Sequence, residues 1–293
     1  MSPVTRREFL LGAGLISAGA IAVAGDSVVI EPYHLELVTV EFELPRLSRA
    51  FDGFRIAQLS DFHCHDSLSH IPIRKAVEMV NRASPDLVVL CGDYVTDSLL
   101  ADYTHDEKQS AKQAEPCAQL LGALRSNLGS LAILGNHDVA TDPQFVTAAL
   151  QAHGIPVLRN SSRVIEREGS RLWFCGLDSW DGKPNIDVAM AGVPKNACVV
   201  MLMHEPDYAD KVAKHPVDLQ LSGHSHGGQI WLPGIGAPWL PFGAHKYPRG
   251  SYQIGQLQLH TNIGLGTIRL PIRLNCTPEV TLVTLRAPRT PKA

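Results

Sequence analysis

The sequence predicts a mixed α/β sandwich with antiparallel strands in its later part. Between residues 55 and 153, short apolar segments alternate with longer segments of helical spacing. From residue 163 onward, Gly169 and Ser170 indicate a hairpin between two strand-like runs, and later segments again resemble sheet. The alternation is typical of strands joined by helices, whereas the hairpin indicates antiparallel pairing.

The first expected elements follow from this periodicity. Residues 28–44 alternate apolar and polar side chains, which is the pattern of strands packed on one face. Residues 55–59 form the next expected strand, 73–83 a helix, 86–90 a strand and 113–128 a helix. A strand over residues 131–134 and a helix over 143–153 complete this part.

The later part of the chain is expected to consist mainly of strands. Residues 163–168 and 171–177 flank the hairpin, and the apolar runs 199–203 and 217–221 each end in polar residues. Residues 251–263 and 280–285 are again sheet-like. The segment 233–248 is rich in Pro, Gly and aromatic residues, and we expect it to be a loop that borders the functional site.

Length and composition describe one globular domain with a short leader. The 293 residues exceed the usual domain size, but mixed α/β chains often reach this length as a single domain. Hydrophobic residues make up 45% and charged residues 19%, which allows a sizeable buried core. The 26 basic and 29 acidic residues give a net charge of -3 without a Lys/Arg stripe, so we expect no nucleic acid polymer as a partner.

Residues 1–25 are expected to be a twin-arginine-type signal peptide or anchor. Arg6 and Arg7 precede residues 10–24, which carry no charge and are rich in small and apolar side chains. Ala22, Val23 and Ala24 match an A-x-A processing site. Export would place residues 26–293 in the periplasm or on the outer face of the cytoplasmic membrane. The alternatives are an uncleaved membrane anchor and a buried N-terminal helix.

The cysteines form no C-x-x-C pair, which argues against a zinc ribbon or a redox pair. We interpret them as small buried hydrophobic residues. Cys64, between two histidines, could alternatively be a soft neighbour of a metal. The full set is Cys64, Cys91, Cys117, Cys175, Cys198 and Cys276.

Polar clusters follow five of the expected strands. Because residues just beyond strand carboxyl ends converge on one crevice in an open α/β sheet, we expect these clusters to meet. Their carboxylate, amide and imidazole groups suit Mn, Fe or Zn ions. The clusters are Asp61 and His63; Gly92 and Asp93; Gly135, Asn136, His137 and Asp138; His204; and Gly223, His224, Ser225 and His226.

Each cluster alone has a simpler explanation. A D-x-H sequence can cap a helix, and G-D or G-N-H-D can form a turn. The G-H-S-H-G-G segment is more specific, because alternate residues of an extended segment place His224 and His226 on one side. The order and shared placement of all five clusters, rather than any single one, therefore indicate a site.

Taken together, the five clusters resemble the motif series of the calcineurin-like metallophosphoesterases: D-x-H, G-D-x-x-D, G-N-H-[DE], an isolated His and G-H-x-H. The resemblance spans residues 54–280 and implies a four-layer α/β/β/α sandwich. One departure is the trailing acid of the second motif, Asp97, which comes one residue late. The resemblance therefore assigns no role to Asp97, whereas Asp93 keeps its place in the motif.

The leader and the segments 204–206, 223–229 and 264–267 are similar to an exported or membrane-associated bacterial phosphodiesterase branch of this superfamily. Some relatives in the wider superfamily act as UDP-2,3-diacylglucosamine hydrolases in lipid A synthesis. This narrower resemblance implies a lipid-linked or cell-envelope substrate and membrane association.

The family resemblance implies two divalent metal ions, with Mn favoured over Fe and Zn. Asp61, His63 and His226 would hold one ion, Asn136, His204 and His224 the other, and Asp93 would bridge them. The two ions would share a hydroxide that attacks phosphorus. His137 would act as the general acid, oriented by Asp138; alternatively, His137 only supports the ligands.

Other residues are weaker candidates. Trp231, Trp239, Phe242 and Tyr247 could form an apolar wall for a lipid or aromatic leaving group, or simply a capping loop packed for stability. Arginine side chains suit phosphate oxygens. The arginines considered for this role are Arg249, Arg269 and Arg273.

We therefore expect a monomeric, metal-dependent hydrolase of phosphodiester or pyrophosphate bonds. The alternatives are an enzyme that acts on soluble nucleotides and an envelope metal-binding protein that has lost catalysis. The second alternative is disfavoured because His137 and all seven ligand positions are intact.

Overall fold

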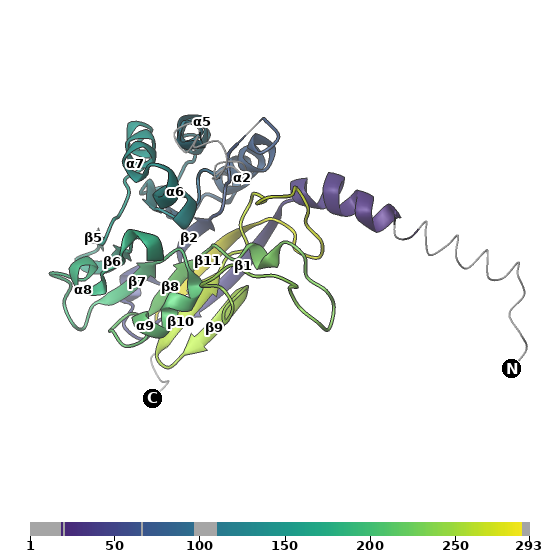
Figure 1. Cartoon of the computed structure of the whole chain (residues 1–293). Coiled ribbons are helices and arrows are strands. Elements are labelled where there is room, and N and C mark those ends of the chain that lie inside the picture. Colours follow the sequence, from purple (N-terminus) through teal and green to yellow (C-terminus); the bar gives the residue numbers. More distant parts are fainter. Residues whose placement is uncertain (1–18, 20, 66, 97–109, 289–293) are drawn as a thin grey trace, which may run out of the picture.

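Two β-sheets form the centre of the protein, as the computed structural model in Figure 1 shows. The residues described are 19, 21–65, 67–96 and 110–288. The expected signal residues 1–18 and 20, and also Asp97, lie outside this part. No helix within the described ranges is long and apolar enough to cross a membrane.

The first sheet has the strand order β1-β11-β2-β3-β4. Parallel pairs join β2 to β3 and β3 to β4, whereas β11 pairs antiparallel with β2 and parallel with β1. The carboxyl ends of β2, β3 and β4 therefore lie along one edge. The bounds are β1 (Glu36–Glu43), β2 (Phe54–Leu59), β3 (Leu87–Cys91), β4 (Ser130–Ile133) and β11 (Glu279–Arg286).

The second sheet has the order β5-β6-β7-β8-β10-β9. The predicted hairpin at Gly169 is present as the antiparallel pair β5–β6, and β9–β10 is a second antiparallel pair. Strands β6, β7, β8 and β10 are parallel. The bounds are β5 (Ser161–Arg167), β6 (Ser170–Gly176), β7 (Cys198–Leu202), β8 (Leu219–Ser222), β9 (Gly250–Ile254) and β10 (Leu257–Thr261).

Helices cover the outer face of each sheet. The first sheet carries α2 (His70–Ala83), α5 (Ala114–Leu121) and α7 (Pro143–Ala152), which gather together in Figure 1. The second carries α8 (Ile186–Ala189), η5 (Pro206–Tyr208) and α9 (Ala209–Val212). Short helical segments complete the fold: η1 (Asp26–Ile30), η2 (Glu31–Tyr33), η3 (Arg49–Phe51), α6 (Asn136–Thr141), η4 (Trp180–Gly182) and η6 (His226–Gly228).

Three apolar clusters define the layers. One cluster, which includes Ile56 and Val200, fills the space between the two sheets. A second packs α2, α5 and α7 on the first sheet, and a third packs α8 and α9 on the second. Because successive residues such as Val88 and Val89 face different clusters, β3 is buried on both sides and is apolar throughout. The predicted α/β/β/α sandwich is confirmed.

Three element predictions need correction. Residues 26–33 are helical, although the period-2 pattern predicted a strand from residue 28. Tertiary contacts outweigh the pattern, since the Glu31 carboxylate accepts hydrogen bonds from the backbone N–H groups of Asn275 and Cys276. Helix α5 ends at Leu121 rather than residue 128, because Gly122, a poor helix former, follows it. The G-N-H-D segment begins helix α6 and is not a simple turn.

Candidate metal centre

The structure brings the five polar clusters together, as the placement at strand ends predicted. Asp61 and His63 follow β2, Asp93 follows β3, and Asn136 follows β4 in the first sheet. His204 follows β7, and His224 and His226 follow β8 in the second sheet. Side chains from both sheets therefore meet at the edge where these parallel strands end.

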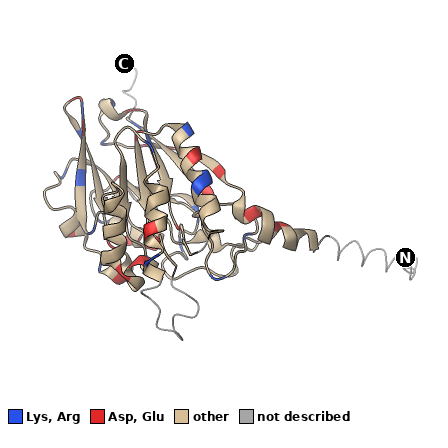
Figure 2. Cartoon of the chain, turned by 90° about the horizontal axis from the view of Figure 1, so that it is seen from above, with Lys and Arg blue, Asp and Glu red and all other residues tan. Residues whose placement is uncertain are grey.

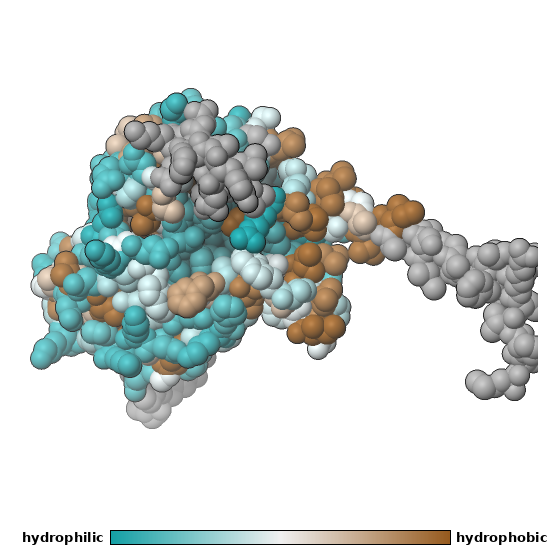
Figure 3. Space-filling view, in the orientation of Figure 1, coloured by the Kyte–Doolittle hydropathy of each residue, from teal (hydrophilic) through white to brown (hydrophobic). Residues whose placement is uncertain are grey.

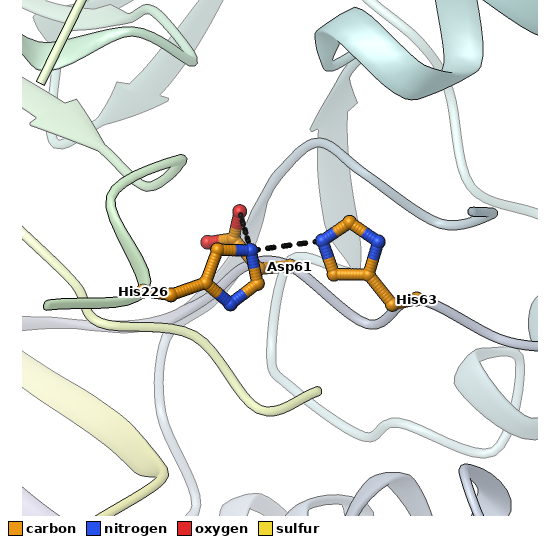
Figure 4. A group of neighbouring side chains, drawn as sticks. All are labelled: Asp61, His63 and His226. Atoms are coloured by element: carbon orange, nitrogen blue, oxygen red, sulfur yellow. Dashed lines mark hydrogen bonds and ion pairs between the residues drawn. The ribbon is translucent and has the colours of Figure 1, made fainter. Parts of the chain in front are cut away.

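One group of potential metal donors consists of Asp61, His63 and His226 (Figure 4). The Nε2 atoms of His63 and His226 lie 2.9 Å apart, and Nε2 of His226 lies 3.6 Å from Oδ1 of Asp61. All three side chains are buried. The two rings and the carboxylate face one another across a space of the size that a coordinated ion requires.

A second group consists of Asp93, His204 and His224. Nε2 of His204 lies 3.0 Å from Oδ2 of Asp93 and 3.2 Å from Nδ1 of His224. Oδ2 of Asp93 also lies 3.7 Å from Nε2 of His63 in the first group. The Asp93 carboxylate therefore stands between the two groups.

Asn136 presents a buried oxygen atom, Oδ1, with no hydrogen-bond partner among the described residues. A buried amide oxygen without a partner is costly unless something else binds it. Asn136 is the first residue of α6 and stands next to His137. A metal ion would satisfy this oxygen.

In three histidines, the ring nitrogen atom that does not belong to the donor group lies within hydrogen-bonding distance of an oxygen atom. Nδ1 of His204 donates to the Cys91 carbonyl at 2.6 Å, and Nε2 of His224 donates to the Phe242 carbonyl at 2.8 Å. Because a carbonyl only accepts, these nitrogen atoms carry the protons, and in the neutral rings the other nitrogen keeps its lone pair. Such partners fix the tautomer and orientation of metal-binding imidazoles.

The third such contact joins Nδ1 of His63 to Oγ1 of Thr96 at 2.9 Å. Nδ1 of His226, in contrast, is buried with no partner among the described residues. His226 is therefore oriented by packing and by its backbone.

Charge in the cluster favours a bound cation. Burial lowers the pKa of His63 and His224 to about 3, so both rings are neutral near pH 7. Burial opposes protonation of His204 too, but the carboxylates of Asp93 and Asp61 outweigh it and raise its pKa well above the usual value. The carboxylates thus attract a positive charge, which a divalent ion can supply at the same donor atoms.

The backbone around the cluster is strained. Five of the seven expected ligands have positive φ: Asp61 (54°), His63 (44°), Asp93 (58°), His224 (71°) and His226 (49°). Non-glycine residues seldom adopt this region, and such strain concentrates at functional sites. The surrounding hydrogen bonds hold these residues in a conformation that turns their side chains toward a common centre.

Glycines make room for the two carboxylates. A Cβ atom on Gly135 would lie 2.1 Å from Oδ1 of Asp93, and one on Gly223 would lie 2.6 Å from Oδ2 of Asp61. The glycines of the G-N-H-D and G-H-S-H segments are therefore needed for close packing against the candidate ligands. This cradle, the unpartnered Asn136 oxygen and the mixed N and O donors fit a pair of divalent ions such as Mn, Fe or Zn.

His137 and Asp138 lie beside the cluster in different roles. The His137 ring packs edge-on against His63 at 5.0 Å between centroids, and its donor atoms group with those of His63 and Asp93. The Asp138 carboxylate accepts hydrogen bonds from the backbone N–H groups of Asp93, Tyr94, Val95 and Gly135. Asp138 thereby holds the Asp93 loop against α6.

One of the three candidate arginines is buried, and the other two lie over tryptophan rings. Arg273 is fully buried, and its guanidinium donates to the carbonyls of Ile263, Gly264, Gly266 and Cys276. The interpretation of Arg273 as a phosphate contact is therefore wrong. Arg249 and Arg269 lie over the rings of Trp231 and Trp239, at 4.8 and 5.4 Å.

Several supporting residues escaped sequence reasoning. The Ser60 hydroxyl donates to Oδ2 of Asp61 at 2.5 Å and lies 2.8 Å from Oδ1 of Asn262. Gly264 packs against Asp61, where an added Cβ would approach to 2.6 Å. The sequence contains little indication of these residues. Ser60 only precedes the candidate ligand Asp61, and Asn262 lies 202 residues after Ser60. All six cysteines are buried and none forms a disulfide, in agreement with their interpretation as packed hydrophobic residues.

Imidazole, amide and carboxylate groups clustered at the strand ends of a two-sheet sandwich are typical of metal-dependent hydrolases. The family model of the calcineurin-like phosphoesterases matches residues 54–228. The chain is 33% identical to the uncharacterized metallophosphoesterase YkuE of Bacillus subtilis over 98% of this chain and 99% of that protein. It therefore belongs to the calcineurin-like phosphoesterase family and is a hydrolase of phosphoester bonds.

Two further relatives carry more specific names. The phosphodiesterase YaeI of Escherichia coli is 29% identical over 96% of this chain and 99% of that protein. The UDP-2,3-diacylglucosamine pyrophosphatase LpxG of Chlamydia trachomatis is 25% identical over 87% of this chain and 90% of that protein. These names state the activities of the two relatives.

Proposed function

We propose that this protein hydrolyses a phosphodiester or pyrophosphate bond of a lipid-linked or cell-envelope substrate at a two-metal centre. The observation that carries the proposal is the position of Asp93. Its Oδ2 atom lies within 4 Å of nitrogen atoms from both donor groups, 3.0 Å from His204 and 3.7 Å from His63. One carboxylate between two sets of donors is the arrangement that holds two ions together.

The proposed ligands fall into two sets. Asp61, His63 and His226 would hold one ion, and Asn136, His204 and His224 the other, with Asp93 shared. When bound, two such ions would supply the Lewis acidity and the activated water for an in-line displacement at phosphorus. The mixed imidazole, amide and carboxylate donors suit Mn, Fe and Zn alike, and we favour Mn because the family resemblance implies it.

The chain's own residues perform the remaining tasks. His137 stands at the edge of the donor cluster, in ring contact with His63, where it can donate a proton to the leaving oxygen. Asp138 acts as a positioning residue, since its carboxylate fastens the backbone of Asp93 and Gly135. The neutral rings of His63 and His224 keep lone pairs available near pH 7.

The relatives and the leader support the choice of substrate. The name of LpxG describes a pyrophosphatase of a lipid-linked sugar nucleotide. The Arg6-Arg7 pair and the uncharged residues 10–24 fit export by the twin-arginine pathway. A periplasmic or membrane-facing enzyme meets envelope lipids rather than cytoplasmic nucleotides.

Turnover assays test the reaction. Purified protein with added Mn²⁺ is expected to cleave bis-p-nitrophenyl phosphate, and Asp93→Asn and His224→Ala are expected to abolish cleavage. Full activity in both correctly folded variants would overturn the proposal. Parallel assays with UDP-2,3-diacylglucosamine and with soluble nucleotides should favour the lipid, and faster nucleotide turnover would remove the lipid assignment while leaving the metal site intact.

A further inference from the structure

A surface loop beside the candidate metal centre contains no charged residue. Residues 229–243 include no Asp, Glu, Lys or Arg, although part of the loop faces solvent. Ile235 is 78% exposed, Phe242 is 72% exposed and Trp239 is 51% exposed. Large apolar side chains gathered on one exposed loop indicate an interaction surface.

Two neighbouring segments extend this apolar surface. Leu270 is 60% exposed in the segment 268–272, and Val29 is 67% exposed in η1. Trp231 donates its backbone N–H to Leu274, and Arg273 donates its backbone N–H to Ser27. These hydrogen bonds, with lengths of 2.8 and 2.9 Å, join the loop and η1 to residues 273 and 274, which directly follow the segment 268–272.

The apolar region lies on the side of the body from which the N-terminal helix projects. Figure 1 shows the helical residues 21–30 leaving the body next to the loops, and Figure 3 shows brown, apolar residues gathered there. Asp26 is the single charged residue among residues 21–30, and Figure 2 shows most of this helix in tan. We call the side chains of Val29, Ile30, Ile235, Trp239 and Leu270 the apolar rim.

The apolar rim has the chemistry of a membrane interface. The guanidinium of Arg269 lies over the ring of Trp239 at 5.4 Å. Trp is enriched at the boundary between acyl chains and headgroups, and Arg there keeps its charge in the polar layer. Arg269 is the single charged residue of the segment 268–272.

From these observations we propose that the apolar rim docks on the surface of a lipid bilayer. The sequence that precedes the helix favours a bilayer over a second copy of the chain. Residues 10–24 carry no charge and immediately precede, in the sequence, the part of the helix that leaves the body on this side. An export signal or anchor in this stretch would bring the rim to the same membrane. The loop also reaches the candidate metal centre, because the Phe242 carbonyl accepts from Nε2 of His224 at 2.8 Å.

Docking would place the candidate metal centre near the headgroup layer. This proposal does not depend on the reaction proposed above, because membrane binding can be measured without turnover. It does predict that a substrate held in a bilayer reaches the site by lateral diffusion.

Tryptophan fluorescence tests whether Trp239 of the apolar rim inserts into a bilayer. The full chain is mixed with vesicles of phosphatidylethanolamine and phosphatidylglycerol that carry brominated acyl chains, which quench inserted tryptophans. We expect quenching of the wild-type protein and loss of most of it in Trp239→Phe. The leader alone could hold the chain on vesicles, so equal quenching in both proteins, or none in either, would overturn the proposal.

Vesicle flotation with a matched pair of variants provides the second arm. Ile235→Asp combined with Leu270→Asp should weaken vesicle binding by about tenfold or more, since charges cannot enter the acyl region. The control combines Phe145→Asp with Val188→Asp, which alter exposed apolar side chains on α7 and α8, and should bind as the wild type does.

Two further readouts separate the outcomes. Cleavage of bis-p-nitrophenyl phosphate should be unchanged in the Ile235→Asp and Leu270→Asp variant, so failure of docking and failure of the reaction are distinguishable. Equal binding by that variant and the control would overturn the proposal. A wild-type dimer without vesicles that becomes a monomer in the variant, with no vesicle binding, would assign the rim to a second copy instead.

Discussion

Nδ1 of His63 lies 2.9 Å from Oγ1 of Thr96, and this contact orients the His63 ring so that its other nitrogen, Nε2, faces the donor group. Thr96→Val keeps the shape of the side chain but removes the oxygen. We expect metal affinity or turnover to fall by about 10- to 100-fold, the usual effect of losing such a partner. Thr96→Ser, which keeps the hydroxyl, should restore most of the loss. A Mn²⁺ titration followed by turnover measures both, and wild-type affinity and rate in Thr96→Val would contradict the orienting role.

His137 can be tested by the leaving group that it is proposed to protonate. An alkoxide needs a proton far more than p-nitrophenolate does. His137→Ala should therefore slow an alkyl phosphodiester by about 10²- to 10⁴-fold. The same variant should slow bis-p-nitrophenyl phosphate much less and should keep its metal content. Equal losses with both substrates would instead indicate a role in supporting the ligands.

Arg273 is expected to stabilise the loop behind Asp61. Its guanidinium donates hydrogen bonds to four carbonyl groups, including those of Gly264 and Gly266. Gly264 in turn packs against Asp61. Arg273→Met would leave these buried acceptors without donors, at a cost on the order of 3 kcal/mol in the free energy of unfolding. Denaturant unfolding, with the exposed Arg163→Met as control, measures this. An unchanged midpoint for Arg273→Met would contradict the structural role.

His260 predicts how stability depends on pH. Burial lowers the pKa of His260 to about 4 in the folded protein, whereas the unfolded value is about 6.5. Between these values the unfolded chain binds more protons, so the free energy of unfolding falls as the pH drops from about 6.5 to 4, by about 3 kcal/mol. His260→Gln should reduce this fall. Unfolding curves across the pH range for both proteins test it, and identical pH slopes would exclude His260 as a contributor.

Sequence periodicity anticipated much of the fold and the convergence of the polar clusters. Short strands with apolar side chains precede the candidate ligands Asp61, Asp93, Asn136, His204 and His224. Because the carboxyl ends of parallel strands lie at one edge of a sheet, residues that follow such strands in the sequence could be expected to lie close together. The family resemblance supplied the division of roles among these residues, and those roles remain proposals.

Contacts between segments that are distant in the sequence could not be predicted from local sequence patterns. The helical conformation of residues 26–33 depends on Glu31 binding backbone groups near residue 275, a contact that no local pattern encodes. Arg273 resembles any basic residue in the sequence, yet it is buried among carbonyl groups. The positive φ of Asp61 and His63 likewise depends on the surrounding structure, because residues other than glycine adopt that conformation only in a small minority of positions.

Metal content per chain tests the two-metal site most directly. Protein loaded with Mn²⁺, freed of excess ion by gel filtration and analysed by mass spectrometry of the metal should contain two ions per chain. His224→Ala should lose one of these ions while His226 and His63 keep the other, and Asp93→Asn should lose much of both. A wild-type protein that retains no stoichiometric metal, or that cleaves bis-p-nitrophenyl phosphate equally well after complete chelation, would contradict the assignment.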